Sequence, residues 1–236
     1  MSGGRTRSRE PRGPLPAGPL NRREVAERLR QRAARVQLDV SGQLLEQLLS
    51  YVELLHRWNA RVNLTSLDAG DDGLDRLIVE PLAAARHVGS PAPRVIDIGS
   101  GGGSPAIPLR LALPGGSLLM VEAKARKAAF LREAVRHLGL ADTVVEARRF
   151  EELAGRPSLQ GAFDLLTLRA VRVDATVLCG LQTFLRGGAD LFLFAGPRGD
   201  APPAAVELPL VPHATHPLVP SLRSRLMVLR KAPADP

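Results

Sequence analysis

Apolar residues over Ser41–Val62 recur every three or four positions, which is the spacing of one buried stripe on a helix. A shorter helix is expected to begin near Asn21, where Glu24 follows three residues later as in a capping box. An amphipathic stripe has to be covered by other apolar surface. We therefore expect the longer helix to lie against the rest of the chain.

The next segment predicts a loop at Ala69–Gly73 and a further helix over Leu74–Val88. Together with the helices before it, this segment makes residues 21–90 a helical extension packed on a main domain. Residues 1–20 are rich in Pro, Gly and Arg, have few apolar positions, and are expected to form a disordered basic tail.

From residue 91 onward, strand and helix patterns alternate. Arg94–Ile98 is short, rich in β-branched residues and followed by glycine, which is typical of a buried strand. The later predicted strands are Leu118–Glu122, Thr143–Ala147, Asp164–Leu168, Ala189–Phe194 and Leu226–Leu229, and the predicted helices are Ala125–Leu138 and Val173–Phe184. This order predicts an α/β, Rossmann-like domain over residues 91–236, with a mainly parallel twisted sheet and helices on both faces.

Charge is concentrated at the N-terminus. The whole chain has a formal net charge of +8, and residues 1–35 hold ten Arg against three Glu, which accounts for +7. Such an arm favours a polyanionic partner such as RNA, although a solvated tail would have the same composition.

Other features narrow the class of protein. No run of 18 apolar residues is present, so no membrane partner is expected, and no short apolar run follows a basic N-terminus, so no secretory signal is expected. The single cysteine, Cys179, fits a reducing cytoplasm. His213 and His216 lie among prolines without acidic or thiol company, so we interpret them as loop residues and expect no metal site.

The glycine-rich stretch after the first predicted strand carries the most chemical information. Glycines there allow a ligand to approach backbone amides at a helix N-terminus. Asp97, Gly99, Gly101 and Gly103 match the D-x-G-x-G-x-G spacing of S-adenosylmethionine-dependent methyltransferases. Gly101-x-Gly103-x-x-Ala106 also matches a dinucleotide pattern, but it starts two residues late. Glu122, at the end of the second strand, would suit the ribose of either cofactor.

Four longer stretches extend this motif. They are Leu55–Ser66 (LHRWNARVNLTS), Asp97–Leu109 (DIGSGGGSPAIPL), Arg126–Arg132 (RKAAFLR), and Asp164 followed by Arg169 and Ala170. With them the chain resembles the bacterial small-subunit ribosomal RNA methyltransferase G family, also called the glucose-inhibited division protein B family. The resemblance implies a cytoplasmic enzyme that uses S-adenosyl-L-methionine to methylate N7 of a guanine in 16S rRNA, acting on the rRNA or the small ribosomal subunit. We expect it to be a monomer.

The resemblance also implies roles for individual residues. Gly99 and Ser104 fall at the cofactor loop, and Phe150 and Glu151 fall where a residue pair flanks the adenine. Arg169 falls where an arginine closes the site, and it is the candidate catalytic residue. Each has a plainer interpretation: Phe150 as core, Glu151 as a solvated acid, and Arg169 as the partner of a carboxylate such as Asp164 or Glu80.

The chain departs from the family's pattern on the presumed substrate side. The usual His-x-x-Asp-Ser reads Leu77-Ile-Val-Glu80-Pro81, and Ala195 stands where a Lys is frequent. These departures keep two other functions open. One is an RNA-binding ribosome-assembly paralogue with weak or no catalysis, and the other, less favoured, is an NAD-dependent oxidoreductase.

Overall fold

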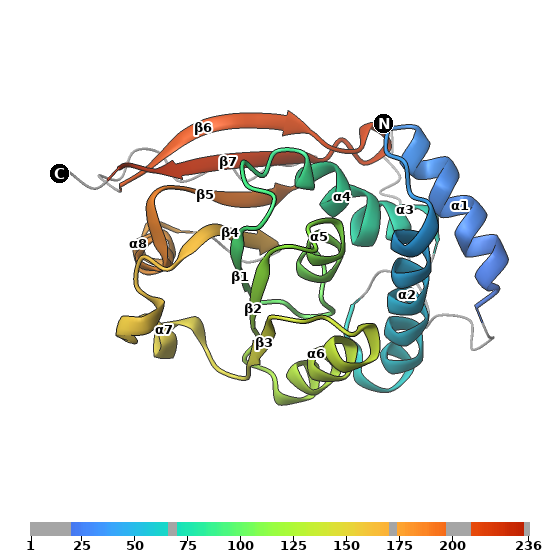
Figure 1. The fold of residues 1–236 in the computed structure, drawn as a ribbon, viewed down its shortest axis with the longest axis horizontal. Coiled ribbons are helices and arrows are strands. Elements are labelled where there is room, and N and C mark those ends of the chain that lie inside the picture. The colour runs from blue at the N-terminus through green and yellow to red at the C-terminus, as the bar shows by residue number, and fades with distance from the viewer. Residues whose placement is uncertain (1–19, 66–69, 170–173, 197–208, 234–236) are drawn as a thin grey trace, which may run out of the picture.

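The computed structural model describes residues 20–65, 70–169, 174–196 and 209–233. Its strands are β1 (Arg94–Ile98), β2 (Ser117–Val121), β3 (Thr143–Glu146), β4 (Phe163–Arg169), β5 (Leu185–Ala195), β6 (Leu210–Pro217) and β7 (Arg225–Lys231). They form one seven-stranded sheet in the order β3-β2-β1-β4-β5-β7-β6 (Figure 1). Strands β1 to β5 pair in parallel, whereas β7 is antiparallel to both β5 and β6. The predicted α/β, Rossmann-like fold with a mainly parallel sheet is confirmed.

Helices cover both faces of the sheet. They are α1 (Arg22–Ala34), α2 (Gly42–Val62), α3 (Asp71–Leu74), α4 (Glu80–Ala85), α5 (Ala106–Ala112), α6 (Ala125–Leu138), α7 (Phe150–Leu153) and α8 (Ala175–Leu181). Helices α1 to α6 lie on one side of the sheet, and α7 and α8 lie on the other (Figure 1). Short 3-10 turns occupy Pro157–Leu159, Gln182–Phe184 and Pro220–Leu222.

Alternation along the first strand separates two cores. Val95 belongs to the cluster that includes α2, α5 and α6, whereas Ile96 and Ile98 belong to the cluster beneath α7 and α8. Successive strand side chains point to opposite faces, and both faces are covered, so apolar residues of this strand are buried on both sides of the sheet. This double burial fixes the strand and hence the loop that follows it.

The N-terminal helices pack on the sheet domain through their apolar stripe. The Asn21 side chain accepts a hydrogen bond from the Glu24 amide, which confirms the predicted start of α1. Residues of the α2 stripe share a core cluster with sheet residues, and the rings of Trp58 and Phe130 meet edge to face at 5.8 Å between α2 and α6. Apolar contacts thus join the N-terminal helices to the sheet domain.

Two local predictions were wrong. The expected loop at Ala69–Gly73 already turns helical at Asp71, and the helix continues through a π-helical segment, Asp75–Val79, into α4. His213 and His216 lie in strand β6, which pairs only with β7 in the described sheet, and not in a loop. An edge strand tolerates prolines because one side of it needs no donors. The His216 ring stacks on His87, with centroids 3.7 Å apart.

Some predictions fall on residues outside the described ranges. They include the disordered tail over residues 1–19, the ends of two motifs at Ser66 and Ala170, and the first residue of the predicted helix, Val173.

A buried ion pair attaches α1 to the π-helical segment Asp75–Val79. Arg32 and Asp75 are 6% and 1% exposed, and the Arg32 Nε donates to Asp75 Oδ1 at 2.6 Å. We expect Arg32→Ala to lower the free energy of unfolding by about 3–5 kcal/mol, because it leaves a buried carboxylate unpaired. Urea unfolding measures the effect. Arg30→Ala, on the exposed face of the same helix, should stay within about 0.5 kcal/mol, and equal losses in the two variants would contradict the assignment.

Candidate cofactor and methyl-transfer site

The chain bends sharply between β1 and α5. Gly99, Gly101 and Gly103 all have positive φ, at 73°, 53° and 88°. L-residues with side chains rarely adopt this conformation, which explains why these three positions are glycine. A Cβ on Gly103 would come within 2.5 Å of the Ile107 side chain, whereas Gly99 is exposed. The bend thus presents backbone to solvent at its start and packs tightly at its end.

Glu122 holds this bend from the neighbouring strand. Its carboxylate accepts hydrogen bonds from the Gly101 amide at 2.9 Å and from the Lys124 amide at 2.8 Å. The amides of Gly99 and Ser100 donate to the Val121 carbonyl at the end of β2. The structure therefore brings Glu122 and the glycine loop together, as the alternating strands predicted. Its contact with a ribose stays a prediction.

Helix α2 supports the loop from the other side. The buried Tyr51 hydroxyl donates to the Gly102 carbonyl at 2.6 Å, and a Cβ on Gly102 would lie 3.2 Å from the Leu55 side chain. Burial strongly raises the pKa of Tyr51, which keeps the hydroxyl a donor. Sequence reasoning did not assign Tyr51 to the site. The available signal was a tyrosine on an apolar stripe, because a buried phenol needs a partner.

The LHRWNARVNLTS stretch now has a structural explanation. Asn63 ends α2 in a left-handed conformation, and Asn59 exchanges two hydrogen bonds with the Thr65 backbone. Lys127 of α6 donates to the Leu64 carbonyl at 3.1 Å. These contacts fix the turn after α2 against the glycine loop.

Asp97 lies beneath the loop at 1% exposure. Its Oδ1 accepts a hydrogen bond from the Thr167 hydroxyl, and among the described residues its Oδ2 has no partner. Burial raises the pKa of Asp97 to about 6, against the hydrogen bonds and the charge of Arg169, which lower it. An unpartnered carboxylate oxygen beneath a glycine bend is a natural acceptor for a bound ligand.

Arg169 ends β4 and is held on several sides. Its Nη1 lies 3.0 Å from Glu80 Oε2 and also donates to the Arg76 carbonyl, and its guanidinium stacks over Phe194 at 4.5 Å. Of the two candidate carboxylates, Glu80 is thus the partner, whereas Asp164 bonds Arg94 and Arg186. The Nε and Nη2 atoms are buried and have no partner among the described residues. Burial lowers the pKa of Arg169, and Glu80 opposes this shift.

The remaining predicted site residues lie apart from this cluster or face away from it. The Ser104 hydroxyl donates to the Leu77 carbonyl at 2.9 Å. Phe150 begins α7 and packs against the core on the opposite face of the sheet, next to Gly180, while Glu151 is exposed. Contacts of these three residues with a cofactor stay predictions.

Comparison with known proteins identifies the family. The family model described as rRNA small subunit methyltransferase G matches residues 44–201. The chain belongs to this family. It is 37% identical over 183 residues to the ribosomal RNA small subunit methyltransferase G of Stenotrophomonas maltophilia (strain K279a), covering 78% of this chain and 80% of the relative. The protein of the same name from Prochlorococcus marinus (strain MIT 9313) is 38% identical over 160 residues. This match covers 66% of this chain and 65% of the relative. The predicted resemblance is confirmed.

Solved structures show the same fold at low identity. The chain is similar to a point mutant of MtNAS in complex with S-adenosylmethionine, with a TM-score of 0.53, 16% identity, and coverage of 88% of this chain and 98% of that one. It is also similar to the [4+2]-cyclase SpnF, with a TM-score of 0.54, 14% identity, and coverage of 82% and 97%. At this level of identity the likeness shows the fold alone.

Two negative findings concern the described part of the chain. None of its helices combines the length and apolar character needed to cross a bilayer. Within the same residues, His, Cys, Asp and Glu form no group of three or more that could hold a metal ion.

A small hollow lined by Pro93, Val95, Leu109 and Leu118 opens at the opposite end of β1 from the glycine loop.

The raised pKa of Asp97 predicts a pH effect on stability. Because its pKa is higher in the folded chain (about 6) than the ordinary 3.8, folding favours the protonated form. Stabilisation present below pH 4 is therefore lost as the pH rises to about 6, by about 3 kcal/mol for this shift. Asp97→Asn removes this dependence, so the variant should gain stability relative to the wild type between pH 4 and 7. Urea unfolding at both pH values measures the gain, and a constant difference would contradict it.

Proposed function

We propose that this chain is an S-adenosylmethionine-dependent methyltransferase that methylates N7 of a guanine in 16S rRNA. The observation that carries the proposal is the glycine bend over Asp97, Glu122 and Arg169, in a chain that belongs to the methyltransferase G family. We expect the protein to act as a monomer in the cytoplasm, where its RNA substrate is found.

The residues at the bend fit S-adenosylmethionine. Gly99 is exposed and Gly101 is open, since a Cβ there would meet nothing closer than 3.6 Å. Gly101, Gly103 and the start of α5 would hold the methionine side of the cofactor, and Glu122 would hold the ribose, exchanging its present amide partners for hydroxyls. Phe150 and Glu151 follow β3 in the sequence. They would flank the adenine from the carboxyl end of that strand.

Methyl transfer to guanine N7 does not require acid–base catalysis by side chains of this chain. The bound cofactor supplies an electrophilic methyl group on a sulfonium. Guanine N7 has a free lone pair and no proton to remove, so no general base is needed. The enzyme's task is orientation, which can contribute about 7–11 kcal/mol to lowering a barrier. Arg169 would orient the base, and two unpartnered donor atoms on a guanidinium paired with Glu80 support this role.

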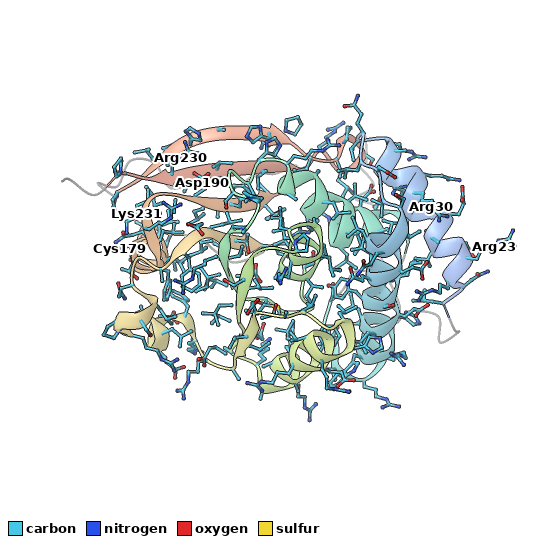
Figure 2. All side chains as sticks on the ribbon, in the orientation of Figure 1. Arg23, Arg30, Cys179, Asp190, Arg230 and Lys231 are labelled. Carbon is cyan, nitrogen blue, oxygen red and sulfur yellow. The ribbon has the colours of Figure 1, made fainter. Side chains whose placement is uncertain are left out.

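The departures from the family's pattern are compatible with this role. Glu80 stands where the family has Asp, and it forms the ion pair with Arg169 at 3.0 Å. Leu77 is buried, and it contributes its carbonyl to Ser104. Arg23 and Arg30 project from the outer face of α1, where they would add salt-sensitive attraction to RNA (Figure 2).

Cofactor choice is tested by calorimetry on the full chain. We expect saturable heat with S-adenosylmethionine and none with NAD at matched concentrations, because the glycine spacing fits the former without a shift. Binding of NAD alone would end the methyltransferase proposal.

The reaction is tested with methyl-labelled cofactor and small-subunit rRNA, offered both as naked RNA and as assembled subunits. We expect 7-methylguanosine, detected by mass spectrometry of nucleosides. Cofactor binding without label in any guanosine would instead favour the ribosome-assembly paralogue.

Arg169→Lys keeps the charge opposite Glu80 but loses the planar fork, so it separates orientation from folding. We expect kcat to fall about 100-fold, which is the scale of a small misplacement of reacting groups, with the dissociation constant of S-adenosylmethionine within about threefold of wild type. Arg186→Lys, at the exposed Asp164 pair, serves as the matched control. Unchanged kcat for Arg169→Lys would remove this residue from the site.

A further inference from the structure

Pro81 removes one backbone N–H from the hydrogen-bond ladder of a buried helix. The helical stretch runs from Asp71 to Ala85, and within its π-helical segment the Glu80 amide bonds the Asp75 carbonyl five residues back. Residue 81 would continue this ladder to the carbonyl of Arg76 or Leu77. Proline has no N–H, so one of these two carbonyls loses that donor.

Side chains from two other elements donate hydrogen bonds to these carbonyls. The Ser104 hydroxyl, in the glycine loop, donates to the Leu77 carbonyl at 2.9 Å. The Arg169 Nη1, at the end of β4, donates to the Arg76 carbonyl. The open carbonyls of one helix therefore bind the two halves of the proposed site. Leu77 and Pro81 are buried, so water does not readily take over these bonds.

The same turn also orients the free part of the guanidinium. Glu80, one residue before the proline, pairs with Nη1 of Arg169, and Phe194 covers the guanidinium face. Both contacts with the helix use Nη1, so Nε and Nη2 remain without partners in the described chain. The helix thus fixes one nitrogen and leaves the other donors for the site.

We propose that Pro81 and the carbonyls of Arg76 and Leu77 form a bracket that sets the position of the glycine loop relative to Arg169. Ser104 and Pro81 are then positioning residues, and Ser104 acts through the Leu77 carbonyl instead of contacting the cofactor. The kinetic consequences of this bracket rest on the proposed function. The hydrogen bonds from Ser104 and Arg169 to the two carbonyls do not depend on it.

A double-mutant cycle on Pro81→Ala and Ser104→Ala tests the bracket. In the wild-type background, Ser104→Ala removes the hydroxyl that donates to the Leu77 carbonyl, and we expect methyl-transfer kcat to fall about tenfold, together with a lower unfolding midpoint. In the Pro81→Ala background the new amide can satisfy that carbonyl, so the further loss on Ser104→Ala should be below about threefold. Ser104→Thr keeps the hydroxyl and should retain most of the activity.

Ser50→Ala is the matched control, because the Ser50 hydroxyl also donates to a helix carbonyl, that of Glu46, but at an exposed site. It should change neither kcat nor the midpoint. If Ser104→Ala instead weakens S-adenosylmethionine binding by the same factor in both backgrounds, Ser104 contacts the cofactor and the bracket is wrong.

The unfolding measurements keep the bracket separate from the enzymatic proposal. If the wild-type chain neither binds S-adenosylmethionine nor methylates RNA, the proposed function fails, yet non-additive unfolding free energies in the cycle still support the bracket. Additive unfolding free energies overturn it, whatever the activity. Should Pro81→Ala fail to fold, the contrast between Ser104→Ala and Ser104→Thr decides: equal midpoints for these two variants contradict a role for the hydroxyl.

Discussion

A backbone bend that leaves space for a ligand has to be held by contacts from outside, because its own side chains are missing. Here the hydrogen bonds come from three directions: Glu122 directly after β2, Tyr51 on α2, and the helix before β1 through Ser104. Each partner lies on an element fixed by burial on the sheet. The helical extension is therefore part of the site, since without α2 and its tyrosine the Gly102 carbonyl would lose a buried partner.

Charge burial is the second constraint on this region. Asp97, Glu80 and Arg169 are shielded from water within one neighbourhood, where an unpaired charge is costly. Arg169 faces both acids, and Arg76 lies 3.9 Å from Glu80 Oε1. Each of the three side chains keeps at least one buried polar atom without a hydrogen-bond partner among the described residues. Among the described residues, one other buried side-chain atom lacks a partner, Arg110 Nε, so such atoms are concentrated in this region. We interpret them as the groups that bound molecules complete, which links the incomplete hydrogen bonding of this region to its proposed chemistry.

The sequence carried different amounts of information about different elements. Strands β1 and β2 and helices α2 and α6 were predictable because double burial or one apolar stripe leaves a clear period. Strand β6 was not, because an edge strand can hold Pro212 and Pro217 and bury little. The glycine loop and Glu122 followed from motif spacing. The Glu80 partner of Arg169 could be proposed but not chosen over Asp164, since the choice depends on how a helix and a strand end meet 89 positions apart in sequence.

The arginines of the basic N-terminal segment have two different roles, which its composition does not distinguish. Some form ion pairs within the fold, and others face outward. Within α1, Arg22 pairs with Glu46 and Glu53, Arg28 with Asp71, and Arg32 with Asp71 and Asp75. These arginines attach α1 to the helices beneath it, and their charge is largely compensated. Within the described part of α1, cations such as Arg23 and Arg30, which face outward and have no ion pair there, are the ones available to a polyanion (Figure 2). A count of arginines therefore overstates the attraction of this segment to RNA, because a structural arginine releases few counterions when RNA binds.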